Sequence, residues 1–325
     1  MGQGVTEGDL AAVRAGDRRA LARLLTQVEN QTPAAEAALA ALFPHTGRAH
    51  LIGGTGAPGT GKSSLVAELA KVLRRQGESV AIVAVDPTSP FTGGAILGDR
   101  IRMRDLAGDP GVFIRSMASR GALGGLARTT ADAVQVLDAA GFNRVIVETV
   151  GAGQSEVEIA RTAQTVLVVE APGLGDEVQG IKAGILEIAD VLVVNKADLP
   201  GAETALRALR ASLEIGHSAA RRDTAAGWTP PIVATVAVHG QGLEELAGAL
   251  DRHRDHLRAS GADNARERAR LAGDLESRLR GALYQRLLAQ LEPGQFAQTV
   301  DKLQLRELDP AGAVRQLLEA AGPLS

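Results

Sequence analysis

The chain has 325 residues, contains no cysteine and carries a net charge of −3, from 35 basic and 38 acidic residues. This length allows a large buried core, and the lack of cysteine excludes disulfides, thiolate metal sites and thiol catalysis. The balanced charge and an aromatic content of only 2% argue against nucleic acid as a partner. No apolar run approaches the roughly 18 residues of a membrane span, and the N-terminus lacks a secretory signal pattern. We therefore expect a soluble, cytoplasmic protein that makes no contact with a membrane.

The N-terminal residues 9–43 have the pattern of helices. Asp17 stands at a position typical of an N-cap, directly before the segment RRALARLLTQVEN. The apolar residues of this segment recur at helical spacing on one face: Leu21, Leu24, Leu25 and Val28. Such a face must pack against another part of the protein.

Seven short, apolar, β-branched segments follow between residues 50 and 237, separated by longer helical or polar stretches. They are HLIGGTG, SVAIVAVD, GVFIRS, RVIVETVG, TVLVVEAP, DVLVVNKAD and PIVATVA. Strands that are apolar on both faces and joined by helix-length connections predict a mainly parallel sheet covered by helices. The predicted fold class is therefore α/β, with helical extensions at both ends of the chain.

After about residue 243 the strand pattern ends and the sequence predicts helices. Leucines recur every four residues from Leu271 to Leu287, which places them in a row along one helix. Such a row either packs on its own domain or is covered by a second copy or another partner, and the sequence leaves both options open. We expect three parts: an N-terminal helical extension (1–46), a sheet domain (47–255) and a C-terminal helical arm (256–325).

The segment GAPGTGKSS, residues 56–64, lies between the first predicted strand and a predicted helix and matches the pattern GxxxxGK[ST]. In this pattern, backbone N–H groups of a glycine-rich turn and a helix N-terminus surround the phosphates of a nucleotide. Lys62 is expected to bridge the β- and γ-phosphates, and Ser63 to bind Mg²⁺. The sheet is therefore predicted to be that of a P-loop NTPase. The expected phosphate-binding residues are Gly56, Ala57, Pro58, Gly59, Thr60, Gly61, Lys62, Ser63 and Ser64.

The segment VLVVNKADL predicts which base is bound, because it places Asn195, Lys196 and Asp198 after a buried strand, at the edge where open α/β sheets bind ligands. Guanine presents two adjacent donors that the Asp198 carboxylate can accept together, whereas adenine would leave that carboxylate unpaired. The penalty of about 1–3 kcal/mol predicts a preference for GTP of at least about tenfold. Lys196 is expected along the base plane, and Asn195 is expected to tie this loop to the phosphate loop.

The segment VIVETVGAGQSE, residues 145–156, ends a strand and contains a candidate metal ligand and a candidate switch. Glu148 would hold Mg²⁺ directly or through water, and the Gly151 N–H would contact the γ-phosphate. Hydrolysis would remove that contact, so this loop is expected to change conformation. Asp86 and Asp99, which follow the second strand and a glycine-rich loop, are further candidate metal ligands beside Ser63, although Asp86 could instead be a plain turn residue.

Phosphoryl transfer requires positioning and charge neutralisation, and no pocket for a second substrate is evident, so water is the expected acceptor. Lys62 and Glu148 are the expected catalytic groups, with Gln154 as the candidate that orients the attacking water. Arg100 and Arg104 are candidates for stabilising charge in the transition state.

These segments, together with VAVDPTSPFTGGAILGDRIRM and APGLGDEVQGIKAGI, resemble the methylmalonyl-CoA mutase-associated GTPases, for which ArgK and LAO/AO transport-system kinase are older names. The resemblance extends from about residue 15 to 260. It implies a homodimeric G protein that binds GTP, GDP and Mg²⁺ and dimerises through a C-terminal helical arm. It also implies a chaperone for an adenosylcobalamin-dependent acyl-CoA mutase, which gates cofactor delivery from a cobalamin adenosyltransferase and helps to remove inactivated cofactor.

The same resemblance assigns roles to three loops. Residues 151–156 become a switch, and residues 172–182, PGLGDEVQGIK, become an additional switch toward the mutase. Residues 235–240, TVAVHG, take the place of the loop behind the guanine base, with Val236 and Ala237 as base-binding residues. Ala237 stands where that motif often begins with serine, which leaves this contact to the backbone.

Two other functions remain alternatives at this stage. A kinase that phosphorylates a transport component would need an acceptor group and a base beside the phosphate, and the sequence identifies neither. A GTPase that delivers nickel would be expected to carry a Cys/His cluster. The one close histidine pair, His253 and His256, is expected instead on a solvated helix face.

Overall fold

The structure is a computed structural model that describes residues 5–87, 103–106, 108–119, 125–149, 159, 162–173, 183–216 and 227–322. By compactness the chain divides into two units, Met1–Arg270 and Leu271–Ser325, which are described separately. Within the described part of the chain, no helix combines the length and the apolar character needed to cross a membrane.

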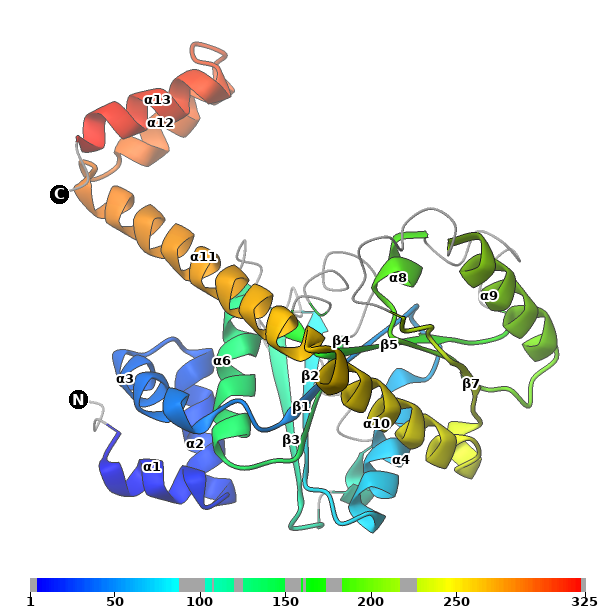
Figure 1. Cartoon of the computed structure of the whole chain (residues 1–325). Helices are drawn as coiled ribbons and strands as arrows, with labels where there is room; N and C mark the ends of the chain where they lie inside the picture. The colour runs from blue at the N-terminus through cyan, green and yellow to red at the C-terminus, as the bar shows by residue number, and fades with distance from the viewer. Residues whose placement is uncertain are drawn as a thin grey trace. The chain divides into compact units, whose positions relative to one another are not determined.

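The first unit is built on a seven-stranded parallel sheet (Figure 1). Its strands are β1 (His50–Thr55), β2 (Val80–Pro87), β3 (Val112–Ser119), β4 (Arg144–Thr149), β5 (Thr165–Glu170), β6 (Val191–Val194) and β7 (Ile232–Ala234). They lie in the order β3-β2-β4-β1-β5-β6-β7, and every pair of neighbours is parallel. The seven predicted strands and the predicted parallel sheet are confirmed.

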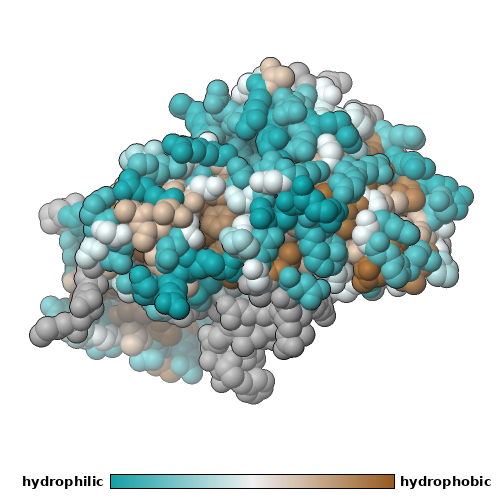
Figure 2. Space-filling model, turned by 90° about the horizontal axis from the view of Figure 1, so that it is seen from below, coloured by the Kyte–Doolittle hydropathy of each residue, from teal (hydrophilic) through white to brown (hydrophobic). Residues whose placement is uncertain are grey.

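Helices cover both faces of this sheet. They are α1 (Glu7–Arg14), α2 (Arg18–Glu29), α3 (Pro33–Leu42), α4 (Lys62–Arg75), α6 (Gly125–Ala139), α8 (Ala183–Ile188), α9 (Ala202–Gly216) and α10 (Leu243–Ser260), with short 3-10 helices η1 (Phe43–His45), η2 (Arg104–Leu106) and η3 (Ala237–His239). In Figure 1, α1, α2, α3 and α6 lie on one side of the sheet and α4 and α10 on the other. On the face drawn in Figure 2, the exposed residues are mostly hydrophilic, with hydrophobic residues in small groups between them.

The alternation of side chains along each strand explains why apolar cores form on both faces of the sheet. In β2, Val83 and Val85 pack into the core with α2, α3 and α6, whereas Val80 and Ile82 pack into the core with α4 and α10. Because successive side chains of a strand point to opposite faces, a strand covered on both sides must be apolar throughout. This is the pattern that the sequence shows.

The N-terminal helices are part of the first core. Asp17 caps α2 as expected, since its carboxylate accepts a hydrogen bond of 2.7 Å from the Ala20 N–H. The four residues of the predicted apolar face, Leu21, Leu24, Leu25 and Val28, are all buried. They pack with α6 and the sheet in one continuous cluster, so these helices complete one face of the sheet.

The structure corrects one expectation about α10. His253 is only 1% exposed, so it does not lie on a solvated helix face. It follows Leu246 and Leu250 and precedes Leu257 at spacings of three or four residues, which places it on the buried face of the helix. The ring contacts the indole of Trp228, with ring centroids 4.8 Å apart.

The helix α11 (Ala262–Gln290) begins in the first unit and continues into the second. The second unit also contains α12 (Gln295–Gln304) and α13 (Pro310–Ala321). The predicted leucine row lies on α11, where Leu275, Leu279 and Leu283 are 68%, 55% and 41% exposed. The three predicted parts and their boundaries stay a prediction.

Candidate nucleotide-binding site

The phosphate loop connects the carboxyl end of β1 to the amino end of α4, as the sequence predicts. Three glycines in it have positive φ: Gly56 at 140°, Gly59 at 86° and Gly61 at 88°. L-residues with a side chain rarely adopt such values, so the path of the loop depends on glycine at these positions. Gly61 is the N-cap of α4 and has no side chain to cap the helix, which leaves the first N–H groups directed toward the loop.

Position 56 also requires glycine for steric reasons. A Cβ at this position would lie 2.1 Å from the carbonyl oxygen of Val169 on the neighbouring strand β5. The loop therefore leaves the sheet in direct contact with β5, and a methyl group would force the two backbones apart. This close approach fixes where the phosphate loop stands relative to the sheet.

Two side chains at the start of α4 face the loop and the end of β4. The Lys62 ammonium is buried and donates hydrogen bonds to the carbonyl oxygens of Gly56, at 2.7 Å, and Ala57, at 3.0 Å. The Ser63 hydroxyl donates to Glu148 Oε1 at 2.5 Å, and both side chains are buried. The structure thus brings together the side chains of Lys62, Ser63 and Glu148, although Glu148 lies 86 positions after Lys62 in the sequence.

Ser63 and Glu148 fit a small divalent cation chemically. Mg²⁺ prefers hard oxygen ligands and is commonly held by one or two carboxylates together with a hydroxyl and phosphate oxygens. Among the described residues no cluster of three His, Cys, Asp or Glu side chains exists that could hold a metal alone.

The other predicted metal and switch residues are only partly covered. Asp86 lies in β2, one residue beyond Val85, which pairs with Thr149, so its backbone is at the same sheet edge as Glu148. Asp99, Gly151, Gln154 and the rest of residues 151–156 lie outside the described residues, as do Arg100 and residues 174–182. Arg104 begins η2, and its side chain is not described. Their roles stay predictions.

Asn195 joins the second loop to the phosphate loop, as the sequence predicts. Its side-chain amide donates to the Thr60 carbonyl oxygen at 2.9 Å. Its Oδ1 accepts hydrogen bonds from Thr235 Oγ1 at 3.1 Å and from the Ala237 N–H at 3.2 Å. One buried side chain therefore connects three loops at the carboxyl edge of the sheet.

Lys196 and Asp198 complete this second loop. Lys196 has a positive φ of 57°, and its Nζ donates to the Gly59 carbonyl oxygen at 2.8 Å, so its aliphatic stem crosses toward the phosphate loop. Asp198 is exposed, and its carboxylate is accessible to a ligand. The residues expected to bind a base are therefore gathered beside those expected to bind phosphates.

Thr235 belongs to the segment 235–240 that was expected behind the base, but no role of its own could be assigned to this residue from the sequence. It is 1% exposed, and its hydroxyl and carbonyl oxygen hold Asn195 and the Ala197 N–H. Its position directly before Val236 and Ala237 was the available signal. Ala237 begins η3, and its N–H bonds to Asn195, so the segment 235–237 supports the base loop from behind.

Replacing Gly56 with alanine should abolish nucleotide binding, because the added Cβ meets the backbone of β5 and the φ of 140° is strained for alanine. Gly77→Ala is a matched control, since Gly77 also has a positive φ, 86°, but a Cβ there would have nothing within 4 Å. The control should lose only about 1–3 kcal/mol of stability and keep nucleotide affinity. Titration calorimetry with GDP and thermal melts measure both effects. Equal behaviour of the two variants would contradict the role of the β5 contact.

Comparisons with known proteins agree with this geometry. The model of the family "Methylmalonyl Co-A mutase-associated GTPase MeaB" matches residues 21–292. A putative GTPase of Pyrococcus abyssi is 46% identical over 307 residues, which cover 94% of each chain. The mitochondrial "Methylmalonic aciduria type A homolog" of Mus musculus is 34% identical over 220 residues, 65% of this chain and 50% of that protein. The crystal structure of a LAO/AO transport system kinase superposes with a TM-score of 0.72 at 29% identity, covering 97% of this chain and 98% of the other.

Proposed function

The chain belongs to the methylmalonyl-CoA mutase-associated GTPases, and we propose that its GTP hydrolysis controls the loading and repair of adenosylcobalamin in a partner acyl-CoA mutase. The protein is a P-loop GTPase that converts GTP to GDP and phosphate. The assigned chaperone role, its Mg²⁺ dependence and its partners are the proposed part.

The observation that carries the proposal is the meeting of the phosphate loop with the end of β4. The hydroxyl of Ser63, at the end of the phosphate loop, lies 2.5 Å from Oε1 of Glu148, the second-to-last residue of β4. Mg²⁺ bound at these oxygens would neutralise charge on the β- and γ-phosphates, while Lys62 would donate to the same phosphates. The chain continues from β4 directly into residues 150–156. Loss of the γ-phosphate would therefore change the conformation of that segment first.

This arrangement suits a protein whose product is a change of shape. Lys62 and the N-terminus of α4 can hold phosphate oxygens, and Glu148 can hold a metal. Asp198 would select guanine, and Asn195 holds the base loop on the phosphate loop. Gln154 is the proposed residue that orients water. No acceptor other than water is required by these groups, which supports hydrolysis over transfer to a second substrate.

The mutase is the proposed partner because the matching family is described as mutase-associated and a mouse relative bears the name of a methylmalonic aciduria protein. A cobalamin adenosyltransferase is proposed as the second partner, from which the cofactor is received. The exposed leucine row of α11 supports a homodimer, since Leu275, Leu279 and Leu283 would be covered by an apolar surface of a second copy.

A nucleotide-dependent capture experiment tests the partner. The purified full chain, loaded with GDP or with a non-hydrolysable GTP analogue, is mixed with a purified adenosylcobalamin-dependent methylmalonyl-CoA mutase and analysed by size-exclusion chromatography with light scattering. We expect a complex whose dissociation constant differs at least about fivefold between the two nucleotides, the lower range of coupling between two binding sites. Equal affinity in both states would contradict gating by GTP, and lack of any complex would contradict the partner.

A further inference from the structure

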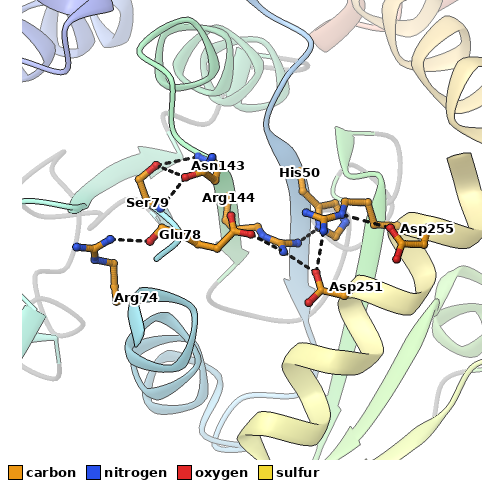
Figure 3. A network of polar contacts seen from close by, with 9 residues as sticks. His50, Arg74, Glu78, Ser79, Asn143, Arg144, Asp251 and Asp255 are labelled. Carbon is orange, nitrogen blue, oxygen red and sulfur yellow. Dashed lines mark hydrogen bonds and ion pairs between the residues drawn. The ribbon is translucent and has the colours of Figure 1, made fainter. Parts of the chain in front are cut away.

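A chain of polar side chains crosses the interior of the first unit between the sheet and α10. Arg144 Nη1 lies 2.6 Å from His50 Nδ1, and His50 Nε2 lies 2.7 Å from Thr165 Oγ1. Thr165 Oγ1 lies 2.9 Å from His253 Nδ1, and His253 Nε2 lies 3.3 Å from Asp190 Oδ1. Figure 3 shows the first link, with the Arg144 guanidinium beside His50 and Asp251. Four of the five side chains are no more than 3% exposed, and Asp190 is 6% exposed.

The order of donors along this chain is fixed by its two ends. An arginine side chain can only donate, so His50 Nδ1 must accept and the proton of neutral His50 must be on Nε2. That N–H donates to Thr165, whose own hydroxyl proton is then directed to His253 Nδ1. His253 therefore carries its proton on Nε2, which lies 3.3 Å from the Asp190 carboxylate. This order of donors requires the same tautomer, with the proton on Nε2, in both neutral rings.

Asp190 is the point where this chain reaches the start of α11. Its carboxylate accepts two hydrogen bonds of 2.8 Å from Arg266, one to each oxygen, and one of 2.9 Å from the Val166 N–H. Gln164 adds a bond of 3.0 Å from its side-chain amide to Asp263. The first turns of α11 are thus attached to the amino ends of β5 and β6 through the buried Asp190 carboxylate and through Gln164.

The aspartate, histidine and threonine at one end of the chain have the order of a nucleophilic triad, with Asp190 beside His253 and His253 beside Thr165. Thr165 is, however, 0% exposed, and its hydroxyl is already bonded to His50 on the other side. A nucleophile needs a substrate within reach, so these residues serve a structural purpose.

We propose that the chain from Arg144 to Asp190 is a proton-sensitive lock, which holds α10 and the start of α11 on the sheet while His50 and His253 are neutral and weakens this attachment in acid. A proton added to His50 Nδ1 would place an N–H against the N–H of Arg144, and two positive charges side by side. A proton added to His253 Nδ1 would direct a second N–H at Thr165 Oγ1 and leave the hydroxyl proton without its acceptor.

The charged groups around the two rings determine the balance. His50 on β1 faces Arg144 on β4 and, on α10, Arg254, Arg258 and His253; burial and then these cations hold the pKa of His50 well below its usual range. Glu78 and Asp251 accept hydrogen bonds from Arg144 and partly offset this positive charge.

His253 on α10 faces Asp190 before β6, Arg266 on α11, His50 on β1 and Trp228, whose indole N–H donates to the Asp190 carbonyl oxygen. Burial raises the pKa of Asp190, but hydrogen bonds from Arg266 and His253 outweigh burial and lower it to about 2. Asp190 therefore stays ionised in the pH range where His50 takes up a proton, and the acid response belongs to His50.

The direction of the pH dependence follows from His50. In the closed state α10 and the start of α11 are held on the sheet, and in the open state they are released. Because the pKa of His50 is lower in the closed state, the open state binds more protons below about pH 6.5, the usual pKa of histidine. The attachment is fully stable above that pH and weakens as the pH falls, by up to about tenfold in the opening equilibrium per pH unit as His50 takes up its proton.

Hydrogen exchange of the full chain tests the lock. Between pH 7.5 and pH 5.0 we expect protection factors, corrected for intrinsic exchange, to fall tenfold or more in residues 250–266, while those of β2 and β3 change less than threefold. His50→Gln retains an acceptor for Arg144 and a donor for Thr165 but cannot titrate, so it should remove most of this acid effect. His239 is exposed and takes no part in the contacts between Arg144 and Asp190. His239→Gln is therefore the control and should show the same acid effect on hydrogen exchange as the native protein.

A second measurement remains informative if the variant is unstable. Nitrogen-15 NMR of the native chain should show His50 and His253 protonated on Nε2 only at pH 7.5. Protection of residues 250–266 that is unchanged at pH 5.0, or lost together with that of β2 and β3, would overturn the proposal. So would a Nδ1–H tautomer, or titration of His50 at its usual pKa.

Discussion

Replacing Lys62 with alanine should reduce the affinity for GTP and GDP by about a hundredfold or more, while the chain remains folded. The ammonium is expected to make charge-assisted bonds to two phosphates, each worth about 1.5–3 kcal/mol, and about 1.4 kcal/mol corresponds to a factor of ten. In the structure Lys62 is buried and donates to the carbonyl oxygens of Gly56 and Ala57. Its removal should therefore also cost about 1–3 kcal/mol of stability, less than the total of a typical domain.

Titration calorimetry with GDP and with a GTP analogue measures this affinity, and circular dichroism checks the fold. Lys71→Ala is a suitable control, because Lys71 lies on the same helix and pairs with Glu68 at 2.6 Å, away from the loop. If the alanine variant does not fold, Lys62→Met keeps most of the aliphatic stem without the charge. Native affinity in a folded Lys62 variant would refute the assigned role of the phosphate loop.

Replacing Asp198 with asparagine should shift the preference from guanosine to xanthosine nucleotides. A carboxylate accepts from both N1–H and the exocyclic amine of guanine, whereas an amide can accept from N1–H and donate to the carbonyl that replaces the amine in xanthine. The mismatch should weaken GTP binding by about 1–3 kcal/mol, or roughly 5- to 150-fold, and strengthen XTP binding by a similar factor.

The exposure of Asp198 makes this test clean, since the substitution changes no buried contact among the described residues. Competition between labelled GDP and unlabelled GTP or XTP gives the two affinities. Asp301→Asn, an exposed aspartate on α12, should change neither. Unchanged GTP affinity in the Asp198 variant would remove the assignment of the base site.

The two nucleotide loops could be identified from the sequence because each is a short, continuous segment. The order of residues along 56–64 sets where glycines permit positive φ and where Lys62 and Ser63 enter the helix. Likewise, residues 195–198 follow a buried strand directly, so their place at the edge of the sheet follows from the strand itself. Local geometry in such segments depends little on distant contacts.

The contacts between the loops could be expected but not located from sequence alone. Asn195 meets Thr60 across 135 positions and Thr235 across 40, and the role of Thr235 went unrecognised. A threonine at a strand end has many possible partners, and only the pairing of β6 with β7 in the folded sheet places Thr235 beside Asn195. Gly56 shows the same dependence, because its need for glycine arises partly from Val169 of β5.

The sequence by itself determined the elements that follow from a periodic pattern or from a short continuous segment. These are the seven apolar strands, the amphipathic helices, the phosphate loop and the base loop. What only the tertiary structure decided is which polar groups are buried together. His253 was expected in solvent, yet it is 1% exposed and linked to Thr165 and Asp190. The physical reason is that burying a polar side chain is favourable only when its partners are in place, and those partners come from strands and helices far apart in the chain.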